Sequence, residues 1–409
     1  MPAGPAAPSI TISSAAPSAA DPTPSTGEPV PATVAQPQQH AVDQLLAAGA
    51  AGDRAAWDAR VAPADAAAAD HARVLFDNLR TLRLARLHAR LTGARLQLPA
   101  ARQAALGSGA GVVQAQLTWR LPGESADASA TVWLTLVPGA DGPRLAGTGD
   151  GPDLDSSPQP LWWLGPTVRV DRGPVTVLVG AGQDADRWAG LAARAAAAVR
   201  ADLPAPLARR WDGRAVVEVP ASTADFARVL GADPAAYART AAVTRPEGPT
   251  TEAAVRVVVN PSTADDPADE LGTLLTHETV HVATRSGRSP APLWVVEGLA
   301  EHVALQAHPD QRAAEVAALR AAPGGPALPP DAAFAAGAHD VTAAYARAWL
   351  ACRAVADHRG EAALGRFYAA LDAGSSLDRA ARSTLGVRGG TVARWADDAV
   401  RRALRDGQG

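Results

Sequence analysis

The chain has 409 residues, of which 38 are basic, all of them arginine, and 42 are acidic, so its formal net charge is -4 at pH 7. This balance, without any basic run, argues against a dedicated nucleic-acid-binding protein. The single cysteine, Cys352, excludes an internal disulfide and a cysteine-based zinc site. No stretch is long and apolar enough to predict a membrane span, and the length predicts two globular units with tails.

Residues 1–38 are rich in Pro, Ala, Ser and Thr and contain almost no large apolar side chains. Such a segment buries too little apolar surface to order itself, so we expect a disordered tail. The start of the chain has neither the basic nor the apolar region of a secretion signal. Tails of this composition often connect an anchor to a folded extracytoplasmic part, which favours an extracytoplasmic or cell-surface location, with the cytoplasm as the alternative.

Residues 39–150 are expected to form a first domain in which helices precede an antiparallel sheet. Apolar residues at helical spacing predict helices at 41–57 and 67–82. Alternation of apolar and polar residues is clearest from Val113 to Trp119 and indicates a half-buried strand. The predicted strands are 94–98, 112–121, 130–137 and 144–147. Helices followed by a curved antiparallel sheet resemble the nuclear-transport-factor-2-like or cystatin-like cone, and this resemblance implies a non-catalytic accessory domain.

A stretch rich in Gly, Pro, Asp and Ser at 150–160 predicts a domain boundary. We interpret residues 151–173 as a linker and connecting segment, and residues 174–409 as the second domain. The first part of this domain alternates between strands and helices, which predicts an α/β subdomain. Its predicted elements are strands at 175–180, 215–219, 241–244 and 254–260 and helices at 184–202 and 224–230.

An H-E-x-x-H pattern made of His277, Glu278 and His281 follows this subdomain. Apolar residues from Leu271 to Val282 predict a helix here, with Asp265, Asp266 and Asp269 as capping and first-turn acids. Residues four apart lie on one side of a helix, so the two histidines can present their imidazoles to one ion. Glu278 is then placed to act on a metal-bound water. The alternative is a pair of surface histidines on an amphipathic helix.

A second predicted helix places Glu297 among apolar neighbours, in the run Leu293-Trp-Val-Val-Glu-Gly-Leu-Ala-Glu301. A carboxylate in such surroundings faces a desolvation penalty unless a positive group meets it. A zinc ion is such a group. Glu297 is therefore our predicted third ligand.

Together the two helices resemble the gluzincin metallopeptidases, and especially the bacterial peptidase MA-like domains. The resemblance rests on H-E-x-x-H followed by W-x-x-E-G-x-A-E, and it extends from about residue 174 to the C-terminus. It implies a gluzincin fold with a sheet beside the active-site helix, and a Zn²⁺ site of His277, His281 and Glu297 with Glu278 as general base. It also implies that Glu301 orients a ligand histidine. The gap between His281 and Glu297 is shorter than in many gluzincins.

The rest of the chain is predicted to be helical, at 310–321, 341–358, 361–371, 377–385 and 391–405. Trp349, Phe367, Tyr368 and Trp395 are expected to pack the core of these helices. In the resemblance, Tyr345 takes the position of the residue that stabilises the oxyanion, with core packing as the alternative. His302 and His339 are weaker candidates for that role.

These patterns together predict an α+β chain of two domains that acts as a zinc-dependent peptidase. It would hydrolyse peptide bonds through a zinc-activated water with Glu278 as general base. Its expected partner is a peptide or protein substrate, with no nucleic acid and no membrane span in this chain. Two alternatives stay open: a zinc-binding but catalytically idle scaffold, and a surface interaction protein whose H-E-x-x-H pattern is accidental.

Overall fold

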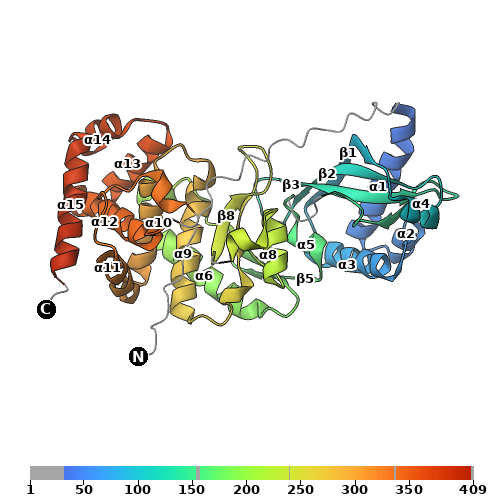
Figure 1. The fold of residues 1–409 in the computed structure, drawn as a ribbon, viewed down its shortest axis with the longest axis horizontal. Helices are drawn as coiled ribbons and strands as arrows, with labels where there is room; N and C mark the ends of the chain where they lie inside the picture. The colour runs from blue at the N-terminus through green and yellow to red at the C-terminus, as the bar shows by residue number, and fades with distance from the viewer. Residues whose placement is uncertain (1–31, 153–156, 239, 336–337, 407–409) are drawn as a thin grey trace.

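The computed structural model describes residues 32–152, 157–238, 240–335 and 338–406. Most of the predicted tail lies outside these residues, and helix α1 (Ala32–Ala51) begins before the predicted end of the tail. The described residues combine helices with two sheets, which agrees with the predicted α+β class. Figure 1 shows the first sheet at one end of an elongated molecule, the second sheet in the middle and the C-terminal helices at the other end.

The first sheet is antiparallel throughout and follows the order β1-β2-β3-β4. Its strands are β1 (Arg86–Leu96), β2 (Gly111–Arg120), β3 (Ala128–Val137) and β4 (Arg144–Gly147). Three of them confirm the prediction, but β1 begins well before residue 94. Leu87, Ala89 and Leu91 alternate with polar residues at its start, a pattern that the prediction overlooked, although only Ala89 of the strand is buried. The accompanying helices are α1, α2 (Arg54–Ala59), α3 (Ala66–Leu82) and α4 (Ala100–Leu106).

The second sheet has five strands in the order β5-β6-β7-β9-β8. They are β5 (Thr167–Arg172), β6 (Val175–Gly180), β7 (Ala215–Val219), β8 (Ala242–Pro246) and β9 (Val255–Val259). The three inner strands are parallel to one another, and the edge strands β5 and β8 are antiparallel to their neighbours. The segment 151–173, interpreted as a linker, therefore contains an edge strand. The sequence did not predict this strand because several of its residues are charged and half-exposed, as is common in edge strands.

Two long helices cover one face of the second sheet, and the other face meets the core of the first sheet. On one face, α6 (Ala185–Asp202) and α9 (Ala268–Thr284) pack on alternate valines such as Val177, Val217 and Val257. The opposite face joins the apolar core of the first sheet. The short helices between the strands are α5 (Leu161–Leu164), α7 (Ala205–Ala208) and α8 (Thr223–Leu230).

The two sheets share one apolar core and also a buried ion-pair network. Trp119 of β2 and Trp162 of α5 meet edge to face, with ring centroids 5.9 Å apart. Arg256 of β9 is fully buried and forms salt bridges with Glu218 of β7 (2.7 Å) and with Glu124, which follows β2 (3.2 Å). The predicted boundary near residue 150 therefore separates two parts whose cores are continuous.

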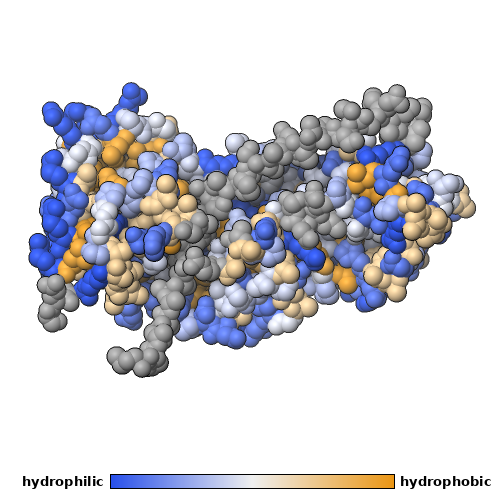
Figure 2. All heavy atoms as spheres, viewed as in Figure 1, coloured by the Kyte–Doolittle hydropathy of each residue, from blue (hydrophilic) through white to orange (hydrophobic). Residues whose placement is uncertain are grey.

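The C-terminal helices form a bundle around α12. Its members are α10 (Leu293–Ala307), α11 (Arg312–Ala321), α12 (Val341–Arg359), α13 (Glu361–Asp372), α14 (Leu377–Leu385) and α15 (Gly389–Arg405). In Figure 2, hydrophilic side chains cover the outer edge of these helices. None of the described helices is long and apolar enough to cross a membrane.

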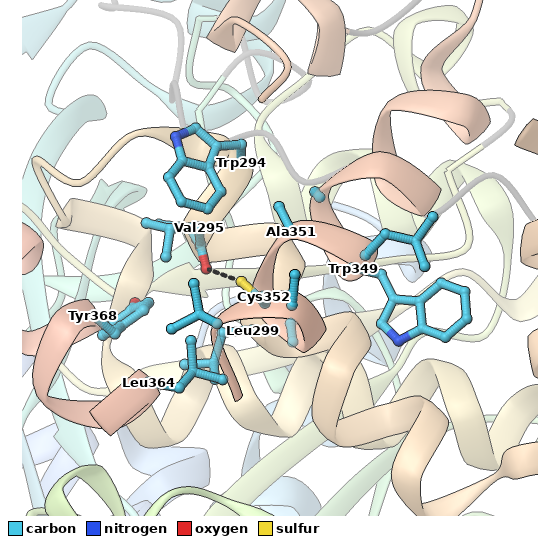
Figure 3. Packing of buried hydrophobic residues seen from close by; sticks show 14 of the residues in the cluster. Trp294, Val295, Leu299, Trp349, Ala351, Cys352, Leu364 and Tyr368 are labelled. Atoms are coloured by element: carbon cyan, nitrogen blue, oxygen red, sulfur yellow. Dashed lines mark hydrogen bonds between the residues drawn. The ribbon is translucent and has the colours of Figure 1, made fainter. Parts of the chain in front are cut away.

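The bundle core confirms the predicted packing roles of its aromatic residues, and Cys352 is buried among them. Trp349, Phe367 and Tyr368 are buried, and Trp395 is half-buried. The Cys352 thiol points toward the carbonyl oxygen of Val295, as Figure 3 shows. Burial raises the pKa of this thiol, which keeps it protonated and unreactive.

Helices α10 and α12 approach closely at Gly298, inside the W-x-x-E-G pattern. A Cβ atom at Gly298 would lie 2.3 Å from the carbonyl oxygen of Ala348. Only glycine fits a helix crossing this tight without moving the backbone. The glycine therefore lets α10 lie against α12 at the height of Glu297.

Candidate metal centre

Helix α9 carries the H-E-x-x-H residues and is buried on all sides. It packs against α6, α10 and β8, and its residues from Leu271 to Ala283 are buried without interruption. Pro267 occupies the N-cap position, and no side chain forms a capping hydrogen bond there. The prediction that Asp265 and Asp266 cap the helix was therefore wrong. Proline suits a helix start because its φ is fixed and its missing N–H is not needed there. Asp269 lies in the first turn, as predicted.

The structure brings His277, His281 and Glu297 together as a group able to hold a metal ion. The two Nε2 atoms are 3.0 Å apart, and Oε2 of Glu297 lies 3.4 Å from His277 Nε2 and 3.6 Å from His281 Nε2. A tetrahedral zinc ion with ligand bonds of about 2.0–2.1 Å requires ligand atoms about 3.4 Å apart. The triangle therefore has the size of a zinc site. Because both histidines are at most 1% exposed, the alternative of two surface histidines is wrong.

The charges at this centre also favour a cation. Glu278, Glu297 and Glu301 are all buried around two imidazoles that are neutral in their ordinary state. Among the described residues, Oε1 of Glu278 and Oε2 of Glu297 have no hydrogen-bond partner. Buried, unpaired carboxylate oxygens are costly, and a divalent ion offsets them.

The pKa shifts of His277 and Glu297 also favour a positive charge at this centre. Burial by itself lowers the pKa of His277, but Glu297 and Glu301 outweigh it and raise the pKa to about 10. Burial raises the pKa of Glu297, and the two neighbouring imidazoles outweigh it, so the net shift is downward. The centre thus holds a positive charge strongly. A bound metal ion would take the place of that proton.

The second ring nitrogen of each histidine also has a neighbour. Oε1 of Glu301 lies 3.3 Å from Nδ1 of His277, which is within salt-bridge distance although the hydrogen-bond alignment is poor. Oγ of Ser286 lies 2.6 Å from Nδ1 of His281. Such partners hold the rings so that the Nε2 atoms face the ion. The contact of Glu301 fits its expected role, whereas Ser286 had no sequence signal.

Glu278 receives a contact that sequence reasoning missed. The hydroxyl of Thr244, on edge strand β8, lies within hydrogen-bond distance of Oε2 of Glu278 and 3.1 Å from its carbonyl oxygen. Thr244 precedes Glu278 by 34 residues, so no local pattern connects them. This contact fixes one carboxylate oxygen and leaves Oε1 to accept a proton.

Tyr345 of α12 lies beside the metal-binding group. Its ring centroid is 6.1 Å from that of His277 and 5.3 Å from that of Phe334, which ends the short 3₁₀ helix η5 (Asp331–Phe334). The ring is buried. This position fits both the oxyanion role and core packing, so the oxyanion role stays a prediction.

The two weaker candidates lie elsewhere. Nε2 of His302 is 2.9 Å from Oε1 of Glu361 on α13 and 2.7 Å from the amide nitrogen of Gln306. His339 is exposed in the turn before α12. Neither belongs to the metal-binding group.

The comparisons with known proteins found no relative that could support a role for this site. No family model matches the chain, and neither the curated proteins nor the solved structures contain a match. The resemblance to gluzincins therefore rests on the motif residues, and the metal-binding group rests on the distances given above.

Proposed function

We propose that the protein is a zinc-dependent peptidase of the gluzincin type. The observation that carries this proposal is the triangle of two imidazole nitrogens and one carboxylate oxygen, with Glu278 next to it on the same helix. Three protein ligands of this kind, with the fourth position open, are typical of catalytic zinc sites. The proposal includes the finer architecture: an accessory domain similar to the nuclear-transport-factor-2-like cone, followed by a gluzincin fold.

In this proposal the chain supplies the proton transfers. A zinc ion held by His277, His281 and Glu297 would act as a Lewis acid and lower the pKa of a bound water to about 7. Oε1 of Glu278 accepts the proton that water loses as its oxygen attacks the scissile carbonyl carbon. The carbon–nitrogen bond then breaks, and Glu278 returns the proton to the leaving amine. Thr244 keeps the other oxygen of Glu278 in place, and Tyr345 donates a hydrogen bond to the developing oxyanion.

One observation favours the catalytically idle scaffold as second candidate. His277, Glu278 and Glu297 are each at most 1% exposed, and a peptide substrate must reach the metal ion. A zinc site that only stabilises the fold is closed in this way. Such a site, however, has no use for a general base, and Glu278 is intact.

Metal analysis and a peptide screen test the proposal in sequence. We expect about one zinc ion per chain, lost on chelation and greatly weakened in Glu297→Ala, because two imidazoles alone hold the ion poorly. Glu270→Ala is the matched control, since Glu270 is a half-buried glutamate in the first turn of α9 and lies outside the ligand group. Zinc-loaded protein is then incubated with a mixed peptide library and followed by mass spectrometry.

The outcomes separate the three readings of the centre. Protein that contains no zinc and takes none up would overturn the ligand assignment and favour an interaction protein. Zinc without cleavage of any peptide would favour the idle scaffold. Zinc together with cleavage supports the peptidase.

A further inference from the structure

A cavity of about 320 Å³ lies at the junction of the two sheets, apart from the metal centre. Its walls come from the turn after β2, from the loop that leads into β7, from the first residues of β7 and β9, and from the end of α9. None of the metal-binding residues lines it. Its size is at the lower end of the range for small-molecule sites.

The cavity carries an excess of positive charge. Arg210, Arg214 and Arg285 line it, together with the acids Glu124 and Asp212. Both acids have partners of their own: Glu124 contacts Arg256 (3.2 Å), and Asp212 accepts a hydrogen bond from the main-chain N–H of Arg214 (2.9 Å).

The guanidinium groups of two of these arginines are left without an acid. Among the described residues, no carboxylate forms a salt bridge with the side chain of Arg210 or Arg214. Both residues are exposed to solvent, so their guanidinium groups are free to pair with a carboxylate or phosphate group that enters the cavity. A ligand that pairs with these guanidinium groups would carry an oxyanion.

The remaining wall of the cavity is apolar. Val216, Val255 and Val282 contribute to it, and Trp211 stands at its side. The indole N–H of Trp211 donates to the carbonyl oxygen of Arg214 (2.8 Å), and the guanidinium of Arg200 lies 5.6 Å from the indole ring. These contacts hold the ring in place as a wall. An apolar wall beside two arginines suits an oxyanion attached to a small aromatic or aliphatic group.

We propose that this cavity binds a small organic anion, a carboxylate or phosphate carried on an aromatic or aliphatic body. The test is isothermal titration calorimetry of the full chain with phenyl phosphate, benzoate and inorganic phosphate at low salt. We expect one saturable site per chain for phenyl phosphate or benzoate, at least about fivefold tighter than for inorganic phosphate because of the apolar wall. The tighter of the two aromatic probes identifies the preferred oxyanion.

A double variant, Arg210→Ala with Arg214→Ala, should lower the affinity for the tighter-binding probe at least about tenfold. A loss of this size corresponds to one charge-assisted contact. The matched control is Arg366→Ala with Arg379→Ala, which removes the same charge from exposed positions on α13 and α14. It should leave binding unchanged within about twofold. Circular dichroism verifies the fold, and Arg214→Gln replaces the double variant if that variant does not fold.

Three results would overturn the proposal. The first is the absence of saturable binding to the wild type. The second is equal weakening by both arginine pairs, which indicates a diffuse effect of charge. The third is binding that is lost in Glu297→Ala but unaffected by the cavity arginines, since this places the anion at the metal centre.

Discussion

Two clusters of buried charge differ in the source of their positive charge. Between the sheets, the chain itself provides it: Arg256 lies between Glu218 and Glu124, and Arg245 contacts Glu247 at 2.6 Å. At the metal centre, three buried glutamates surround two imidazoles, and no arginine of the described residues forms a salt bridge with them. The first cluster sets two guanidinium groups against three carboxylates, whereas the second has no guanidinium partner and depends on a proton or on a cation from solution.

This difference separates a structural cluster from a functional one. Buried ion pairs made by the chain hold elements together, here β9, β7 and the turn after β2. A cluster with a surplus of buried carboxylates is stable only when a ligand or a proton balances it. The lack of any arginine partner among the described residues therefore indicates a cation site at the second cluster more clearly than burial alone does.

The largest effect is expected at Glu278, the proposed general base. Glu278→Gln should leave the zinc content and the fold nearly unchanged, because Glu278 is not a predicted ligand. The amide cannot accept a proton, so the hydrolysis rate of any peptide found in the library screen should fall about a hundredfold to ten-thousandfold. Glu270→Gln, in the first turn of the same helix, is the control and should keep its activity. Activity that survives in Glu278→Gln would assign the cleavage to another site or to a contaminant.

If the network between the sheets is structural, removing its cation should destabilise the whole chain. Arg256→Met leaves the buried carboxylate of Glu218 and the half-buried carboxylate of Glu124 without their cation, and we expect the free energy of unfolding to fall by about 3–5 kcal/mol. Denaturation in urea measures it. Arg382→Ala breaks an exposed pair with Asp378 and should cost at most about 1 kcal/mol. Equal effects of the two variants would contradict the structural role of Arg256.

The network also carries one more acid than base, which makes it sensitive to pH. Burial raises the pKa of Glu218 to about 7, although Arg256 acts to lower it. Because the folded-state pKa lies above the unfolded value, the folded state binds this proton more tightly. The resulting stabilisation is fully present below about pH 4.5 and is lost as the pH rises through about 7.

Glu218→Gln should remove this dependence. The stability difference between wild type and variant should change by about 1–3 kcal/mol between pH 4.5 and pH 8, with the wild type relatively more stable at the lower pH. Urea denaturation of both proteins at the two pH values measures it. Glu361→Gln is the control, since the pKa of Glu361 is lowered rather than raised. A difference that does not change with pH would show that Glu218 stays ionised.

The smallest effect is expected at the contact between β8 and the metal helix. Thr244→Val keeps the volume but removes the hydroxyl beside Glu278, so the carboxylate is held less firmly. We expect the peptidase kcat to fall about tenfold with an unchanged KM, the loss of one hydrogen bond to a charged group. Thr244→Ser keeps the hydroxyl and should retain most of the rate. If the two variants behave alike, Thr244 has no positioning role.

The sequence by itself predicted the features that depend on short spacing. His277 and His281 share one side of α9 because they are one helical turn apart. Strand β2 follows from alternation, and the burial of Glu297 follows from its apolar neighbours. Local periodicity encodes these features wherever one face of an element is buried. The start of β1 and all of β5 were not predicted, although apolar and polar residues alternate there, because few residues of these strands are buried.

The tertiary structure decided every contact between distant segments. Thr244 reaches Glu278 only because β8 is the edge strand beside α9, and strand order is not visible in any local pattern. Ser286 reaches His281 only because the chain turns back after Arg285, which adopts a left-handed conformation (φ 52°). The network around Arg256 likewise joins segments more than 130 residues apart. Such contacts arise from the packing of whole elements. A short stretch of sequence does not show which distant segment it will pack against.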